Sequence, residues 1–241
     1  MAKLKVPSAQ HLARNWQATP QAVQKGLVHL VQHPPTFSYA ALYNYVRDLL
    51  VFGVSYEQIV AAIKRSIRRP DVQANFLELL PLIVDHFRDI GPTYVQGIER
   101  RYYPAGRGLM IPFDPPVIYG VGGEVHFPWL SFWKNNPLAG EKLSLFITIV
   151  DEVLLQDPDL ENAKFHILDF SAPRGSKTRE LIVLEAAEIP RLTPERKDEM
   201  LAIFAEGYFL AADELATTPA PDVEEQAEVD PDQPGLFDDQ I

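Results

Sequence analysis

The sequence contains no cysteine among its 241 residues. This excludes disulfide bonds, thiolate nucleophiles and cysteine-ligated zinc, and it suits a reducing compartment. Long apolar runs are also missing, because no segment approaches the ~18–20 apolar residues that a membrane-spanning helix needs. The lysines near the N-terminus, Lys3 and Lys5, are not followed by the apolar stretch of a signal peptide. We therefore expect a soluble cytoplasmic protein with no membrane partner.

Basic side chains are absent from the C-terminal segment. Residues 213–241 hold ten acidic side chains and no lysine or arginine, whereas residues 1–212 hold 23 acidic and 22 basic ones. Within the remainder, residues 1–107 carry 13 basic and 7 acidic groups, and residues 108–212 carry 9 and 16. The chain thus has a mildly basic first half, an acidic second half and a strongly acidic tail.

Hydrophobic residues make up 46% of the chain and charged residues 23%, which is typical of a globular protein. The first part, residues 1–107, has the apolar periodicity of helices. Thr19-Pro20 matches the start of one helix, and the spacing of Ser55 and Gln58 matches the capping box of another. Short turns marked by proline or glycine separate these segments. This pattern predicts a compact N-terminal helical bundle.

From residue 108 to about residue 215 the pattern is that of an α+β domain. Residues 117–127 form two apolar runs around Gly122-Gly123, which predicts a β-hairpin. The length of segment 143–155 favours a buried helix, although its β-branched first half also fits a strand. Thr193-Pro194 predicts the start of a last helix. Hairpin, helix, strand, strand and helix in this order indicate a mixed sheet with packed helices.

The two strands expected within residues 164–189 form the centre of this domain. Ile167 and Leu168 in the first strand and Leu181–Leu184 in the second leave no polar face. Strands of this kind are usually covered on both sides, so we expect helices over both of them. Asp169 is then a carboxylate at the end of a buried strand, next to the polar segment SAPRGSKTRE.

Residues 216–241 are rich in proline and acidic residues and poor in apolar ones until Leu236. We expect this tail to be disordered, because it has too little apolar surface to fold alone.

Near its end stands Gln233-Pro234-Gly235-Leu236-Phe237, which resembles the short peptide by which bacterial replication and repair proteins dock on the DNA polymerase sliding clamp. Gln233, Leu236 and Phe237 occupy the most telling positions of that peptide. The resemblance implies an accessory protein of DNA replication or repair with the sliding clamp as its partner. An alternative is a structural module whose tail docks on its own folded part.

A second resemblance concerns the carboxylates of the central strands. Asp169 on one strand and Glu185 on the next are similar to the acidic pair of PD-(D/E)xK nucleases, which hold Mg²⁺ for phosphodiester hydrolysis. Ala186-Ala187 follow Glu185, so Lys177 or Lys164 would have to supply the lysine of that family. The alternative is that Asp169 caps the turn that follows it. Apart from this Mg²⁺, the sequence suggests no cofactor.

Basic residues around two turn-linked helices suggest contact with nucleic acid. A turn at Gly53 separates the helices, as in a helix-turn-helix motif. Basic residues at a helix end also interact favourably with the helix dipole, so they need not bind DNA. The candidate contacts are Lys64, Arg65, Arg68, Arg69, Arg100 and Arg101.

Aromatic residues are concentrated just after the expected hairpin. Such a group can stack nucleic-acid bases, or it can pack between sheet and helix. The group consists of Phe127, Trp129, Phe132 and Trp133.

Overall fold

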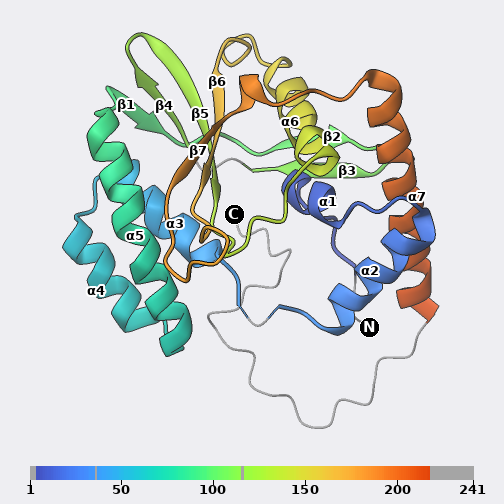
Figure 1. The fold of residues 1–241 in the computed structure, drawn as a ribbon, viewed down its shortest axis with the longest axis horizontal. Coiled ribbons are helices and arrows are strands. Elements are labelled where there is room, and N and C mark those ends of the chain that lie inside the picture. The colour runs from blue at the N-terminus through green and yellow to red at the C-terminus, as the bar shows by residue number, and fades with distance from the viewer. Residues whose placement is uncertain (1–3, 36, 115–116, 218–241) are drawn as a thin grey trace.

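The computed structural model describes residues 4–35, 37–114 and 117–217. It has an α+β architecture in which a mixed five-stranded sheet lies between two groups of helices (Figure 1). The helices are α1 (Ala9–Asn15), α2 (Pro20–Gln32), α3 (Ala40–Leu50), α4 (Tyr56–Ser66), α5 (Pro70–Ile90), α6 (Glu141–Leu154), the 3-10 turn η1 (Ala186–Glu188) and α7 (Pro194–Thr217). The strands are β1 (Tyr94–Gln96), β2 (Arg101–Pro104), β3 (Met110–Phe113), β4 (Ile118–Val121), β5 (Glu124–Ser131), β6 (Lys164–Asp169) and β7 (Ile182–Glu185). The predicted fold class is confirmed.

Helix boundaries follow the capping residues of the sequence. Thr19 Oγ1 accepts the backbone N–H of Ala22 at 3.2 Å at the start of α2. At the start of α4, Ser55 Oγ accepts the Gln58 N–H at 3.3 Å, and Gln58 Oε1 accepts the Ser55 N–H at 3.1 Å. These bonds satisfy backbone donors that have no partner inside a helix. Both predicted helix starts are confirmed.

The sheet has the strand order β1-β4-β5-β6-β7. Strands β4 and β5 form the predicted hairpin, with positive φ angles at Gly122 and Gly123. Strands β5 and β6 are parallel and are connected through α6, which is a helix as its length suggested. Strand β7 returns antiparallel to β6, and β2 and β3 form a separate two-stranded sheet.

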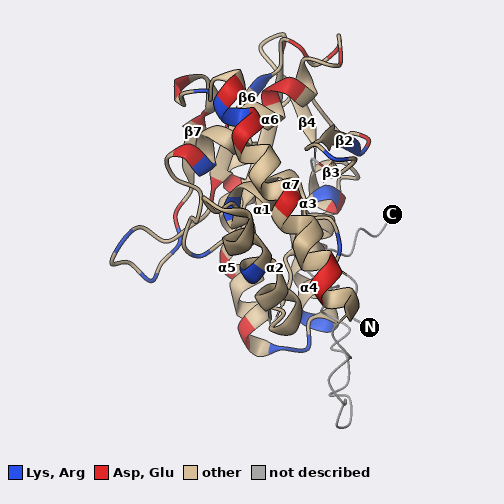
Figure 2. Cartoon of the chain, turned by 90° about the vertical axis from the view of Figure 1, so that its right-hand side faces the viewer, with Lys and Arg blue, Asp and Glu red and all other residues tan. Residues whose placement is uncertain are grey.

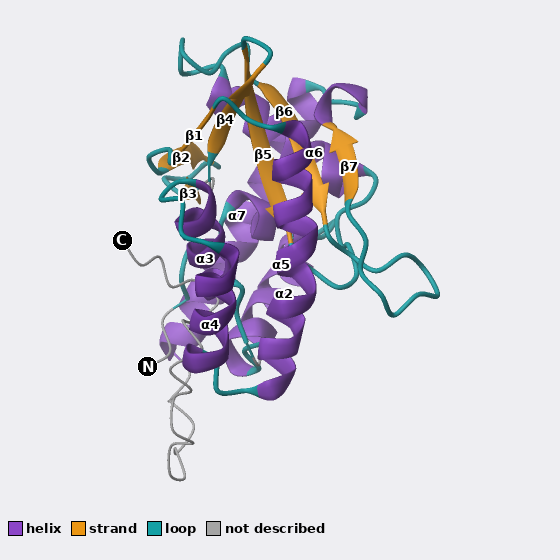
Figure 3. Ribbon diagram, turned by 90° about the vertical axis from the view of Figure 1, so that its left-hand side faces the viewer, coloured by secondary structure: helices purple, strands orange, loops and turns teal. Residues whose placement is uncertain are grey.

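The helices divide between the two faces of the sheet. One apolar core contains residues of α1, α2, α6 and α7 together with Trp129 and Phe165 of the sheet. The other contains residues of α3, α4 and α5 together with Leu130 and Leu168. Helices α3, α4 and α5 stand next to one another on their face (Figure 3). The N-terminal helices therefore cover both faces of a sheet that is made largely of later residues.

The boundary expected near residue 107 falls between β2 and β3, which pair with each other. Strand β1 also lies before this boundary, yet it pairs with β4 beyond it. Residues 1–107 and 108–215 thus share one sheet and two cores. Of the predicted tail, residues 216 and 217 belong to α7, and the others lie outside the described residues.

The expectation that helices cover both central strands holds for β6 and is wrong for β7. Residues 165–169 of β6 are all buried. In β7, Ile182 and Val183 are 42% and 43% exposed. The reason is the position of β7 at the edge of the sheet, which leaves part of its surface to solvent. Among the described residues, no helix is both long and apolar enough to cross a membrane.

Candidate functional site

A cleft of about 700 Å³ lies at the end of β5, between α1 and the start of α3. Its walls come from residues 6–14, from residues 37–43 and from the loop Phe132–Pro137. Helices α1 and α3 belong to opposite faces of the sheet. The cleft therefore opens where the two helical layers separate, at the carboxyl end of the parallel pair β5 and β6. Ligands of α/β sheets commonly bind at such an edge.

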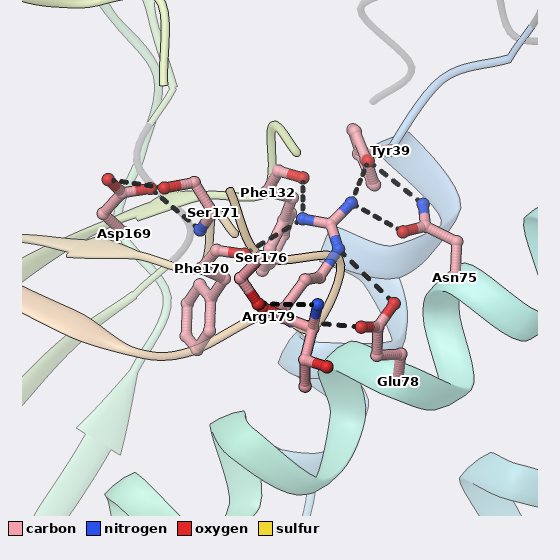
Figure 4. Close-up of polar contacts among 10 residues, drawn as sticks. Tyr39, Asn75, Glu78, Phe132, Asp169, Phe170, Ser171, Ser176 and Arg179 are labelled. Atoms are coloured by element: carbon pink, nitrogen blue, oxygen red, sulfur yellow. Dashed lines mark hydrogen bonds and ion pairs between the residues drawn. The ribbon is translucent and has the colours of Figure 1, made fainter. Parts of the chain in front are cut away.

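Arg179, in the loop before β7, braces one wall of this cleft (Figure 4). Its side chain is only 1% exposed. The guanidinium donates to the backbone carbonyls of Phe132 and Phe170, at 2.8 and 3.0 Å. It also donates to the Tyr39 hydroxyl at 3.0 Å and to Asn75 Oδ1 at 2.6 Å. Phe132 and Tyr39 both line the cleft, so this one side chain fixes two of its rings.

Glu78 on α5 balances the charge of Arg179. Its Oε2 lies 3.7 Å from Arg179 Nε, and its Oε1 accepts the backbone N–H of Arg179 at 3.2 Å. A buried guanidinium without a carboxylate partner would be strongly destabilising. The pairing therefore attaches the loop before β7 to α5.

Asp169 at the end of β6 braces the loop that follows β5. It is 4% exposed, and its carboxylate accepts the Asn136 side-chain amide at 2.8 Å. It also accepts the Ser171 backbone N–H at 3.1 Å and the Ser171 hydroxyl at 3.2 Å. The predicted turn-capping role is confirmed. Because Asn136 lines the cleft, Asp169 also positions its second wall.

Cationic and aromatic groups meet on the α1 side of the cleft. The Arg14 guanidinium lies 5.0 Å from the centre of the Trp133 ring, and His11 meets the same ring edge-on at 5.8 Å. His11 Nδ1 is 2.8 Å from Ser8 Oγ. Burial, together with the charge of Arg14, lowers the pKa of His11 to about 4. His11 is therefore neutral at pH 7, and Arg14 carries the positive charge of this wall.

The structure does not bring the nuclease candidates together. Glu185 pairs in register with His166, whereas Asp169 pairs with Ile182, three residues further along β6. Because side chains alternate along a strand, Asp169 and Glu185 lie on opposite faces of the sheet. Lys177 is exposed in the loop between the strands.

The second candidate lysine is also accounted for. Lys164, at the start of β6, forms an ion pair of 2.6 Å with Glu124. Among the described residues, no group of three or more histidine, aspartate or glutamate side chains could hold a metal ion.

The basic residues proposed for nucleic-acid contact fall into two groups. Lys64 and Arg65 end α4, and Arg68 and Arg69 follow directly in the turn to α5. The remaining two lie elsewhere, at β2, away from this turn (Figure 1). Arg100 pairs with Asp114 at 2.9 Å, and Arg101 pairs with Asp157. Seen from the side of α7, lysine and arginine are interspersed with acidic residues (Figure 2).

Burial separates the members of the aromatic group. Phe127, Trp129 and Phe132 are 0%, 5% and 2% exposed, which confirms that they pack in the core. Trp133 is only partly buried and lines the cleft. The sequence does not distinguish this tryptophan from the others, because its exposure depends on α1, more than a hundred residues earlier.

Arg179 and the cleft are the features that the sequence did not indicate. Arg179 stands in a polar loop, and the partners that bury it come from α3, α5 and β5. Gln233, Leu236 and Phe237 of the clamp-like peptide lie outside the described residues.

Comparison with family models, curated proteins and solved structures gave no match to this chain. The site is therefore interpreted from its own residues.

Proposed function

We propose that the protein is an accessory factor of DNA replication or repair that docks on the polymerase sliding clamp. The observation that carries this proposal is the peptide Gln233-Pro234-Gly235-Leu236-Phe237 in the acidic segment that follows α7. Leucine and phenylalanine at adjacent positions can fill an apolar pocket, and a glutamine three residues before them can form hydrogen bonds at the rim.

The spacing between the peptide and the last helix suits docking at a distance. Helix α7 ends at Thr217, and fifteen residues separate Thr217 from Gln233. This length of chain spans at most about 55 Å when fully extended. The peptide can therefore occupy a partner's pocket while the folded part stays outside it. A short peptide of this kind typically binds with micromolar affinity, because its ordering costs entropy.

No observation favours the nuclease alternative. Asp169 is engaged by Asn136 and Ser171, and Glu185 lies on the opposite face of the sheet. We therefore carry only the clamp proposal forward.

The proposal is tested by titrating a purified bacterial sliding clamp with the full-length protein in a calorimeter. Leu236→Ala with Phe237→Ala should raise the Kd at least about tenfold, because both apolar anchors are lost. Val223→Ala with Val229→Ala is the matched control, since it shortens two apolar side chains of the same segment outside the peptide. An unchanged Kd for the first variant would refute the proposal. A tail that docks on its own folded part would instead lower the Tm of the first variant without any clamp.

A further inference from the structure

The cleft between α1 and α3 carries charge of one sign. Its volume of about 700 Å³ lies within the range of small-molecule sites. Among the described residues that line it, the charged ones are Arg14 and Lys134, and none is aspartate or glutamate. The chain as a whole has 33 acidic and 22 basic residues, so this lining differs from the average surface. Such a lining attracts anions.

Both walls of the cleft present flat rings. Trp133 lies on the α1 side, and Phe37 and Tyr39 lie on the α3 side with their ring centres 5.0 Å apart. Aromatic faces of this kind stack on the bases of nucleotides. The Arg14 guanidinium rests on the Trp133 ring, and a stacked guanidinium directs its N–H donors outward from its edge. This geometry suits the oxygens of a phosphate.

The walls are fixed by buried polar contacts. Arg179 holds the Tyr39 hydroxyl and the Phe132 carbonyl, and Asp169 holds the Asn136 amide. Groups that are ordered before binding lose less entropy when a ligand enters. The cleft is thus built as a site and does not depend on a rearrangement to form.

From the charge, the rings and the fixed walls together, we infer that the cleft binds a nucleotide. Arg14 and Lys134 contact the phosphate, and the base lies between Trp133 and Tyr39. This inference goes beyond sliding-clamp docking and does not depend on the C-terminal peptide, so either can fail while the other stands.

The test is a titration of the ¹⁵N-labelled full-length protein with adenosine 5′-monophosphate, followed by NMR. The indole N–H signal of Trp133 should shift saturably. The signal of Trp16, whose indole donates to the Met200 carbonyl at 3.1 Å, should stay in place and report an intact fold. Arg14→Gln with Lys134→Gln should raise the Kd at least about tenfold, and adenosine without phosphate should bind weaker by a similar factor. Lys64→Gln with Arg65→Gln, on α4, is the matched control and should leave the Kd unchanged.

Three outcomes overturn the inference. The first is a Trp133 signal that does not move at millimolar nucleotide. The second is nucleotide binding that is unaffected by Arg14→Gln with Lys134→Gln while the Trp16 signal shows that this variant is folded. The third is a shift of the Trp133 signal caused by Leu236→Ala with Phe237→Ala in the absence of nucleotide, because the cleft would then hold the chain's own peptide.

Discussion

Burying a charged side chain costs several kcal/mol unless the charge is paired and its donors find acceptors. Arg179 meets both conditions, because Glu78 faces its charge and its terminal nitrogens reach two carbonyls, a hydroxyl and an amide oxygen. These acceptors belong to segments that are far apart in the sequence. One side chain thereby connects the ends of β5 and β6 with α3 and α5.

Replacing Arg179 should therefore destabilise the whole fold. Arg179→Ala leaves Glu78 without its partner and removes the donors of two buried carbonyls, so we expect the free energy of unfolding to fall by about 3 kcal/mol or more. Arg179→Lys keeps the charge but loses the planar donor fork, and it should also be destabilising. Urea unfolding monitored by circular dichroism measures both changes.

Arg174, an exposed arginine in the same loop, provides the control. Arg174→Ala should change the free energy of unfolding by no more than about 0.5 kcal/mol. Equal effects of Arg174→Ala and Arg179→Ala would contradict the structural role of the buried guanidinium.

At the scale of elements, α2 and α7 pack against each other more closely than most side chains would permit. A Cβ atom added to Gly207 on α7 would lie 2.5 Å from Val23 Cβ and 2.6 Å from the Pro20 carbonyl oxygen. The absence of a side chain at this position allows the two helices to make contact. The Gln24 amide adds a hydrogen bond of 2.7 Å to Glu214 further along α7.

The predicted consequence concerns an ordinarily favourable substitution. Alanine in place of glycine inside a helix usually stabilises a protein by up to about 1 kcal/mol. Gly207→Ala should instead cost about 2 kcal/mol, because the added methyl group meets a backbone carbonyl that cannot rotate away. Gly26→Ala on α2 is the control, since a Cβ there meets no atom within 4 Å, and it should raise the Tm. Thermal unfolding of both variants distinguishes the two cases, and a raised Tm for Gly207→Ala would show that the contact is not tight.

The elements that the sequence predicted are those whose signals are local. Thr19, Ser55 and Gln58 mark helix starts because each bonds within its own first turn. Strand β1 was not predicted, because its three residues form a strand only through pairing with β4. There the Tyr94 ring covers Gly120, and a Cβ at Gly120 would come within 2.1 Å of it. The cleft was missed for the same reason, since its walls come from three distant segments.

At the scale of the whole molecule, both helical layers bury histidines that stay neutral. Burial lowers the pKa of His166 to about 4, with a smaller contribution from neighbouring histidines, and burial also lowers the pKa of His126 and of His86 on α5. The Tyr119 hydroxyl lies 2.9 Å from His166 Nε2, between the sheet and α5. In the other layer, His11 has the same low pKa of about 4.

These histidines make the stability of the molecule depend on pH. In the unfolded chain a histidine binds a proton near pH 6.5, whereas His166 in the folded state does so only near pH 4. Between these values the unfolded state holds more protons, so stability is full above pH 6.5 and falls as the pH drops toward 4. From pH 7 to pH 5, His166 alone should remove about 2 kcal/mol, and His11 acts in the same direction.

Urea unfolding at pH 7 and pH 5 measures this loss, in a range above the titration of most carboxylates. His166→Gln removes the titrating ring, so the difference in unfolding free energy between the two pH values should shrink by about 2 kcal/mol even if the variant is less stable at pH 7. The exposed His29 supplies the control, and His29→Gln should keep the wild-type difference. If His166→Gln retained that difference as well, the acid sensitivity would have to arise elsewhere in the molecule.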